Sequence, residues 1–180
     1  MSIIQLHDKQ FKPYISENEI INIVKKVAAD LEKDFDTFNN PLFLIILNGS
    51  FMFAADLFKY LNKPCEMSFV KTSSYHYTKS SGKIQELIGL NENIANRTVI
   101  ILEDIIDTGL TLEYIIKQLK DAGNTDHKIV TAFFKPESFT KDYPIHYIGK
   151  KIPNDFIVGY GLDYNGLGRN LKEVYILHHS

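Results

Sequence analysis

Two runs of almost entirely apolar residues constrain the fold of this chain most strongly. Residues 41 to 47 read PLFLIIL, and residues 98 to 102 read TVIIL. Neither run alternates with polar residues, as a strand with one face in water does. Short continuous apolar runs are typical of strands in a parallel sheet whose two faces are both covered by helices. The two runs therefore predict an α/β fold.

The rest of the chain alternates helix-like and strand-like segments. Residues 16 to 19, SENE, form a capping box, and apolar residues recur with helical spacing from Ile20 to Leu31. The same spacing predicts helices at 51–61 and 112–119, with Gly123 placed to end the second one. Further strands are predicted at 66–71, 84–90, 129–134, 156–160 and 174–177.

The composition is that of one globular domain, and we expect residues 1–180 to form it. The chain is 44% hydrophobic, and its net charge of −2 gives no general attraction to nucleic acid or to an anionic membrane. Cys65 is the one cysteine, which excludes an internal disulfide and favours a reducing compartment. We see no signal peptide and no apolar run of the roughly 20 residues that a membrane helix needs. We therefore expect a cytoplasmic protein.

Three carboxylates follow the second apolar run within five positions: Glu103, Asp104 and Asp107. In open α/β sheets, ligands bind beyond the carboxyl ends of the strands, which is where these acids lie. Residues 108 to 111, TGLT, then lead into the predicted helix. Backbone N–H groups at a helix start bind phosphate, whereas carboxylates bind hydroxyl groups or a cation. The stretch therefore predicts a site for a sugar phosphate.

Each of these residues also has an ordinary explanation when it is taken alone. Acids and small hydroxyl residues favour the first turn of a helix, where they act as caps without binding a ligand. Two other common phosphate motifs, G-x-x-x-x-G-K-[ST] and a G-x-G-x-x-G after a strand, do not occur in this chain. It is the whole string from Glu103 to Thr111 that favours a binding site.

Residues 101 to 111, ILEDIIDTGLT, resemble the phosphoribosyl pyrophosphate (PRPP) signature of the type I phosphoribosyltransferases. More closely, the chain is similar to the hypoxanthine-guanine phosphoribosyltransferases from about Pro41 to its end. The resemblance implies a mainly parallel central sheet flanked by helices, with a small hood and a mobile lid loop. It also implies roles for the residues of the signature. Asp107 is the general base, Glu103 and Asp104 bind the ribose hydroxyls or magnesium, and the 5′-phosphate is held by Thr108, Gly109 and Thr111.

Two further motifs imply contacts to pyrophosphate. In the family, the loop at Asn48 and Gly49 binds pyrophosphate through backbone amides, often beside a non-proline cis peptide. Many relatives carry Lys where Asn48 stands, so a side-chain charge is missing here. Ser74 and Tyr75 precede the polar stretch 76–83, HYTKSSGK, which corresponds to a lid that closes over the site. Taken alone, the first motif also fits a plain Asn-Gly turn, and the second fits a surface hairpin loop.

The last motif lies toward the C-terminus. The resemblance implies that Lys135 donates to the purine 6-oxo group, that Phe156 stacks on the base, and that Ile157 contacts the base through its backbone. Asp163 assists a magnesium ion on pyrophosphate, and Arg169 contacts the pyrophosphate. Alone, a Lys at a strand end is most often solvated and a Phe is most often in the core. The family often has more basic residues after its Lys, whereas here the next residues are PES.

Together the motifs imply transfer of the 5-phosphoribosyl group from PRPP to hypoxanthine and guanine, with Mg²⁺ as cofactor and a homodimer or homotetramer as the assembly. Two alternatives remain open. In the first alternative, the enzyme transfers the phosphoribosyl group to xanthine or another base. Lys135 disfavours adenine as that base, because the lysine and the 6-amino group of adenine are both hydrogen-bond donors. The other alternative is an RNA-binding regulator on the same fold, which the net charge does not favour.

Overall fold

The computed structural model of the protein describes residues 2–73, 85–88 and 92–178. Within these residues, six strands form a central sheet: β3 (Leu42–Leu47), β4 (Glu66–Ser73), β5 (Gln85–Ile88), β6 (Val99–Ile106), β7 (His127–Phe134) and β8 (Tyr147–Lys151). Their order across the sheet is β5-β4-β3-β6-β7-β8. All neighbours pair in parallel except β4 and β5, which are antiparallel. The predicted parallel sheet is confirmed.

The two apolar runs lie side by side in the middle of this sheet. Leu42 pairs with Val99, and Ile45 pairs with Leu102. The chain passes from β3 to β4 on one side of β3, and later returns to place β6 on the other side. A reversal of this kind opens a crevice at the carboxyl ends of the two strands, and ligands of open α/β sheets bind there. The fold therefore puts the loops after β3 and β6 at a favourable place for a site.

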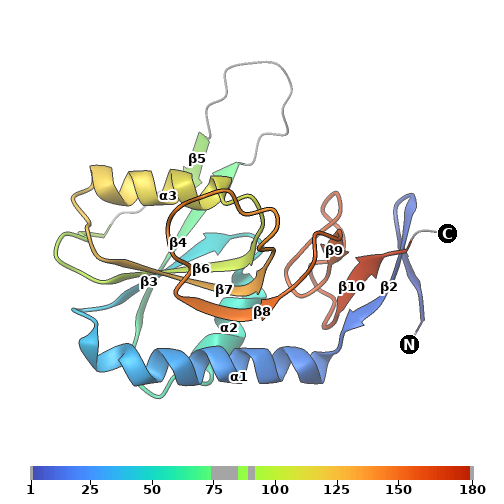
Figure 1. Ribbon diagram of the computed structural model, residues 1–180, viewed down its shortest axis with the longest axis horizontal. Helices are drawn as coiled ribbons and strands as arrows, with labels where there is room; N and C mark the ends of the chain where they lie inside the picture. Colours follow the sequence, from blue (N-terminus) through green and yellow to red (C-terminus); the bar gives the residue numbers. More distant parts are fainter. Residues whose placement is uncertain (1, 74–84, 89–91, 179–180) are drawn as a thin grey trace.

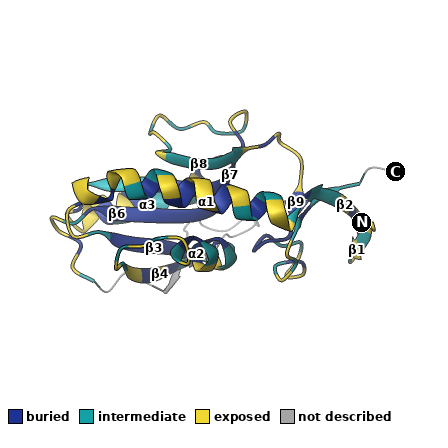
Figure 2. Cartoon of the chain, turned by 90° about the horizontal axis from the view of Figure 1, so that it is seen from below, coloured by how far each residue is buried: buried dark blue, intermediate teal, exposed yellow. Residues whose placement is uncertain are grey.

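Helices cover both faces of the sheet (Figure 1). The described helices are α1 (Glu17–Asp34), the 3₁₀ helix η1 (Phe35–Thr37), α2 (Phe51–Phe58) and α3 (Leu110–Asp121). Phe43 and Ile45 of β3 pack in one core with α1 and α2, whereas Leu42 and Leu44 pack in a second core with α3. Successive side chains of a strand point to opposite faces, so an apolar residue is needed at every position. Figure 2 shows the central strands buried between these layers.

The helix ends largely follow the sequence signals. Ser16 caps α1 by accepting a hydrogen bond from the Glu19 N–H at 3.3 Å. The Glu19 carboxylate lies 2.8 Å from the Lys150 ammonium, so a side chain of β8 is its partner. Gly123, with a φ of 81°, follows the end of α3 as predicted. α3 begins at Leu110, two residues before the predicted start, and α2 ends at Phe58, three residues before the predicted end.

A second, antiparallel sheet forms a hood at one end of the molecule (Figure 1). Its strands are β1 (Ile4–Leu6), β2 (Lys9–Ile15), β9 (Ile157–Val158) and β10 (Val174–Leu177), in the order β1-β2-β10-β9. The sequence predicted β10 correctly, but it missed β1 and β2, and also β8 in the central sheet. β9 has two residues instead of the five predicted. β1 and β8 have no buried residue and β2 has two, so no strong apolar pattern marks these three strands.

The strand with the acids is longer than predicted. β6 continues to Ile106 because its pairing with β7 extends to Ile106 and Phe134. Glu103 and Asp104 therefore lie within the strand rather than after it. The cis peptide bond that the resemblance implied is present, between Leu47 and Asn48. Among the described residues, no helix has the length and apolar character needed to cross a membrane.

Candidate active site

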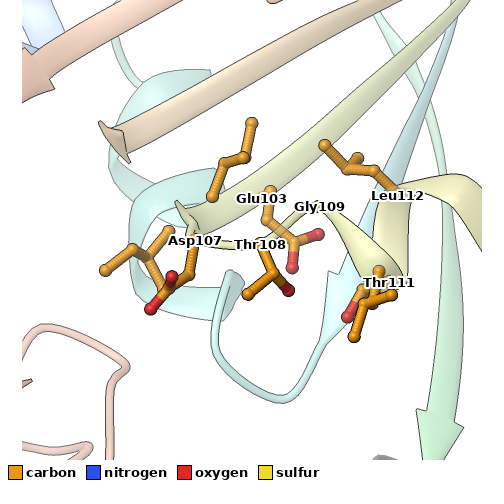
Figure 3. Close-up of a pocket in the computed structure, with 9 residues that line it drawn as sticks. Glu103, Asp107, Thr108, Gly109, Thr111 and Leu112 are labelled. Atoms are coloured by element: carbon orange, nitrogen blue, oxygen red, sulfur yellow. The ribbon is translucent and has the colours of Figure 1, made fainter. Parts of the chain in front are cut away.

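A pocket of about 90 Å³ lies where β6 passes into α3. Glu103 and the residues from Ile105 to Leu112 line it. Figure 3 shows the side chains of Glu103, Thr108 and Thr111 grouped around Gly109. The pocket thus combines a carboxylate, two hydroxyl groups and the start of a helix, as the sequence predicted for this stretch.

Gly109 sets the geometry of the helix start. It is the N-cap residue of α3 and has a φ of 82°, a conformation that favours glycine. A Cβ at this position would lie 2.7 Å from the Phe139 ring. The first N–H groups of a helix have no partner within the helix, and their partial positive charge attracts anions. Thr108, Gly109 and Thr111 are therefore brought together in an arrangement that suits a phosphate group.

The two acids of β6 have different surroundings, because consecutive side chains of a strand point to opposite faces. Glu103 lines the pocket, whereas Asp104 packs against Gly49. Both are buried, with 9% and 8% of their surface exposed. Burial raises the pKa of Glu103 well above its usual range, and the neighbouring Asp104 adds to this effect. Burial also raises the pKa of Asp104, to about 6, although hydrogen bonds from backbone N–H groups act in the opposite direction.

Glu103 has an incomplete hydrogen-bond set. Its buried Oε2 atom has no hydrogen-bond partner within the described part of the chain. A buried polar atom without a partner costs free energy and is commonly explained by a missing ligand, ion or water. The atom therefore fits a contact to a hydroxyl group or to a hydrated cation.

Gly49 joins Asp104 to the C-terminal part of the chain. A Cβ on Gly49 would lie 1.8 Å from Asp104 Oδ2, and a Cβ on Gly161 would lie 2.0 Å from the Gly49 carbonyl oxygen. Arg169 Nη1 donates to the Gly161 carbonyl at 2.7 Å. Only glycines allow the backbones to approach this closely. The contacts bring together the 48–49 loop, Asp104 and Arg169, which sequence analysis had assigned to PRPP.

Asp163 belongs to the same group of residues. Its carboxylate lies 2.5 Å from Arg169 Nη2 and accepts a hydrogen bond from the Gly166 N–H at 2.7 Å. Both residues are close enough to act on the ionisation of Asp104. The Arg169 guanidinium lowers the pKa of Asp104, and the Asp163 carboxylate raises it. A cation and two carboxylates therefore meet beside the 48–49 loop.

Lys135 and Asp107 form an ion pair of 3.0 Å between Nζ and Oδ2. Lys135 is the residue after β7, and its N–H donates to the Ile106 carbonyl at 2.9 Å. The Lys135 side chain is 8% exposed, whereas the Asp107 side chain is 46% exposed. The predicted base-binding lysine therefore contacts the predicted general base directly, at the edge of the pocket.

Phe156 lies in the hood, where its ring packs near two other aromatic side chains. Its ring centroid is 6.1 Å from that of Phe11 and 5.8 Å from that of Tyr164. The Lys9 ammonium lies 5.7 Å from the same centroid. Phe156 remains 42% exposed, so its ring is available to a ligand, whereas Ile157 is buried and pairs with Ile176 of β10.

Sequence reasoning missed several residues of this region. Lys9 lies in β2, a strand that no sequence pattern revealed. Tyr143 donates its hydroxyl hydrogen to the Gly109 carbonyl at 2.8 Å from a loop with no motif. Gly161 stands between two residues that the resemblance had marked, but only the close backbone approach shows its importance. Ser74 and Tyr75, together with the lid stretch 76–83, lie outside the described residues.

The acids fit a magnesium ion only in combination with a ligand. Within residues 2–73, 85–88 and 92–178, no three His, Cys, Asp or Glu side chains come together as a metal-binding group. Glu103, Asp104 and Asp163 therefore do not form one metal site by themselves. Mg²⁺ in phosphate-transfer sites is held by one or two carboxylates, by water and by substrate phosphates. The separate carboxylates of this region fit that pattern.

Comparisons with known proteins agree with this geometry. A family profile described as "Phosphoribosyl transferase domain" matches residues 14–165. A hypoxanthine-guanine phosphoribosyltransferase of Streptococcus mutans is 44% identical over 92% of both chains. A counterpart of the same name in Staphylococcus aureus is 40% identical over 94% of both chains.

Solved structures give the same result. The crystal structure of a hypoxanthine phosphoribosyltransferase from Staphylococcus aureus has a TM-score of 0.84 and 39% identity, and the match covers 93% of this chain and 91% of that one. A hypoxanthine-guanine phosphoribosyltransferase from Bacillus anthracis has a TM-score of 0.83 and 34% identity, with 93% and 97% of the chains covered. The chain therefore belongs to the phosphoribosyltransferase family, and within it to the hypoxanthine-guanine phosphoribosyltransferases.

Proposed function

We propose that the protein transfers the 5-phosphoribosyl group of PRPP to hypoxanthine and guanine, giving IMP or GMP and pyrophosphate, as a step of purine salvage. The observation that carries the proposal is the Lys135–Asp107 pair at the edge of the Glu103–Leu112 pocket. This pair supports the proposal because an ammonium group that can donate to a 6-oxo group lies beside a carboxylate and near the start of α3. The names of the relatives from Streptococcus mutans and Staphylococcus aureus support the same activity.

The phosphates of PRPP occupy two places. Thr108, Gly109 and Thr111 hold the 5′-phosphate at the start of α3, where N–H groups and hydroxyls line the pocket. The backbone of Asn48 and Gly49 and the Arg169 guanidinium hold the pyrophosphate. Asn48 brings no charge, so we assign the positive charge beside this loop to Arg169, which donates to the Gly161 carbonyl where Gly161 packs against Gly49. Ser74 and Tyr75 complete the pyrophosphate site from the lid, which keeps water from the activated sugar.

Glu103 and Asp104 would bind the ribose hydroxyls or, through water, a Mg²⁺ ion, and Asp163 would assist in holding a Mg²⁺ ion. The unpartnered Oε2 atom of Glu103 supports this role. Bound magnesium supplies positive charge that offsets the charge of the leaving pyrophosphate. The protein contributes the buried carboxylates that orient the sugar.

The base lies against Phe156, with Ile157 contacting it through its backbone and the Lys135 ammonium donating to its 6-oxo oxygen. N9 of the base then forms a bond to C1′ of the ribose while the bond from C1′ to pyrophosphate breaks. The Asp107 carboxylate accepts the N7 proton, a role in which general bases contribute roughly 10²–10⁴-fold. Positioning and charge stabilisation supply most of the remaining acceleration.

A spectrophotometric assay tests the proposal. Hypoxanthine, guanine, xanthine and adenine are offered separately with PRPP and Mg²⁺. We expect turnover of the 6-oxopurines hypoxanthine and guanine, no turnover of adenine, and loss of activity on addition of EDTA. Turnover of xanthine alone would show that the enzyme is a xanthine phosphoribosyltransferase instead. A folded protein that binds PRPP but converts none of the bases would contradict the proposed reaction.

The proposal extends to location and assembly. A cytoplasmic location is supported by the single cysteine, Cys65, which suits a reducing compartment. Residues 1–180 act as one phosphoribosyltransferase domain, and the active form is a homodimer or homotetramer, which light scattering after size exclusion measures directly. We assign no nucleic-acid or membrane partner.

A further inference from the structure

The segment 135–143, which follows β7, makes polar contacts to the residues that line the pocket at both of its ends. At its start, Lys135 Nζ lies 3.0 Å from Asp107 Oδ2. At its end, the Tyr143 hydroxyl donates to the Gly109 carbonyl at 2.8 Å. The residues contacted, Asp107 and Gly109, lie two positions apart in the turn that connects β6 to α3. The segment thus ties the predicted base-binding lysine to the predicted phosphate-binding turn.

The Tyr143 contact fixes the orientation of one peptide unit. The Gly109 carbonyl accepts hydrogen bonds from the Tyr143 hydroxyl and from the Glu113 N–H, the latter at 3.0 Å. In a trans peptide unit the C=O and the following N–H point in opposite directions. The Leu110 N–H therefore points away from Tyr143, and Leu110 is one of the residues that line the pocket.

Aromatic packing holds the Tyr143 ring in place. Its centroid is 5.5 Å from that of Phe139, and Phe139 is 5.4 Å from Phe134 of β7, both in edge-to-face geometry. The Phe139 ring also fills the space beside Gly109, where a Cβ would lie 2.7 Å from Cε2. Tyr143 is therefore anchored to the central sheet independently of its hydrogen bond.

The Tyr143 hydroxyl remains a donor at any physiological pH. Burial, together with smaller contributions from the Glu113 and Glu103 carboxylates, raises the pKa of Tyr143 to about 12. The hydrogen bond to Gly109 is thus present throughout the pH range in which an enzyme of this kind is assayed.

We propose that Tyr143 is a positioning residue for the 5′-phosphate of PRPP. Its hydroxyl holds the Gly109 carbonyl so that the N–H groups of the first turn of α3 point into the pocket. Tyr143 touches neither substrate and acts through Gly109. The identification of the ligand as PRPP rests on the proposed function. The role of Tyr143 requires only that a sugar phosphate binds at the start of α3.

Tyr143→Phe tests the proposal because it removes one hydroxyl and retains the ring. The probe is ribose 5-phosphate, whose dissociation constant is measured by isothermal titration calorimetry. We expect it to rise roughly 2- to 10-fold, the range for loss of one neutral hydrogen bond. In steady-state kinetics the KM for PRPP rises by a similar factor, whereas the KM for hypoxanthine does not change.

Tyr147→Phe is the matched control. It also removes one tyrosine hydroxyl, which binds Asp34 at 2.7 Å between β8 and α1. We expect it to leave the binding of ribose 5-phosphate and both KM values unchanged. Thermal unfolding of the two variants separates loss of fold from loss of binding.

The outcomes separate the inference from the proposed function. A wild-type protein that binds ribose 5-phosphate but turns over no purine rejects the proposed function, and the calorimetry still tests Tyr143. Equal binding by the wild type and Tyr143→Phe overturns the positioning role. So does unfolding of Tyr143→Phe, or an equal rise of both KM values, because each reveals a general structural role. Failure of the wild type to bind ribose 5-phosphate overturns the inference and the phosphate assignment together.

Discussion

At the scale of single residues, the Lys135–Asp107 pair concentrates the chemistry of the proposed reaction. The half-exposed carboxylate is held 3.0 Å from a buried ammonium. Replacing Asp107 therefore removes both the proposed proton acceptor and the partner of Lys135. The turn that follows, which we propose binds phosphate, contains Gly109, and the Gly109 carbonyl accepts the hydrogen bond of Tyr143.

We expect Asp107→Asn to lower kcat by roughly 10²–10⁴-fold, because an amide cannot accept the N7 proton. The Kd for PRPP should change far less, since the 5′-phosphate contacts remain. Steady-state kinetics together with calorimetry of PRPP measures both quantities. Asp142→Asn, an exposed position in the loop after β7, serves as the control. An Asp107→Asn variant with wild-type kcat would refute the base assignment.

Asp104 gives a prediction about pH and stability. Burial raises its pKa to about 6 in the folded protein, from a usual value of 3.8. Because the folded state holds the proton more tightly, the resulting stabilisation is complete below about pH 4 and is lost as the pH rises through about 6. A shift of this size corresponds to about 3 kcal/mol.

Asp104→Asn cannot ionise, so the ligand-free variant should gain stability relative to the wild type at pH 8 but not at pH 4. Urea unfolding at the two pH values measures the difference in the free energy of unfolding. Asp155→Asn, at an exposed position, is expected to give no such difference. A pH-independent effect of Asp104→Asn would show that the carboxyl group is not held in its neutral form by burial.

At the scale of elements, the hood and the central sheet contribute different parts of the site. The loop after β3 supplies Asn48 and Gly49, and the end of β6, the turn after it and the start of α3 supply the stretch from Glu103 to Thr111. Phe156 lies just before β9 in the hood. β2 of the hood presents Lys9, whose ammonium lies 5.7 Å from the Phe156 centroid and 4.8 Å from that of Tyr164. The N-terminal hairpin therefore supports the ring that is proposed to stack on the base.

We expect Lys9→Met to raise the KM for hypoxanthine about 2- to 5-fold, because a cation over an exposed ring contributes roughly 0.5–1 kcal/mol. Lys9→Arg keeps a cation over the ring and should retain the wild-type value. Lys12→Met, an exposed position on the same strand, is the control, and the KM for PRPP should stay constant throughout. If Lys9→Met and Lys12→Met behave alike, β2 plays no part in base binding.

At the scale of the whole molecule, ligand binding joins parts of the chain that are distant in sequence. Asp104 of β6, Gly49 after β3 and the 161–169 stretch already touch without a ligand. A ligand that binds only the folded protein raises its stability by an amount set by concentration and affinity. Binding of PRPP with Mg²⁺ should therefore raise the free energy of unfolding of the whole domain.

At a concentration of 100 times its Kd, PRPP with Mg²⁺ should raise Tm by roughly 5–10 °C, since such binding contributes about 2.7 kcal/mol. EDTA should reduce the shift, because the described residues contain no metal-binding group of three His, Cys, Asp or Glu side chains, so the proposed magnesium site needs the substrate phosphates. Differential scanning calorimetry measures both, with ribose as the control that lacks phosphate. A shift of equal size with ribose would argue against the phosphate contacts.

Patterns within the sequence were enough to predict the parallel central sheet, which the structure confirms, and to propose a phosphate-binding stretch. Continuous apolar runs at 41–47 and 98–102 require burial on both faces, which a parallel sheet between helices provides. The string from Glu103 to Thr111 predicted a sugar-phosphate site because its acids, hydroxyls and glycine are adjacent in the chain. These features depend on local periodicity and on neighbouring residues, so they can be read without knowledge of the fold.

Contacts between residues that are distant in the chain depend on how the strands and loops pack. The hood pairs β2, near the N-terminus, with β10, near the C-terminus, and no sequence pattern revealed β2. The Lys135–Asp107 and Tyr143–Gly109 contacts join residues 28 and 34 positions apart. The approach of Gly49 to Asp104 and of Gly161 to Gly49 likewise depends on backbone packing. Such contacts arise when strands and loops are packed together, and no local sequence signal encodes them.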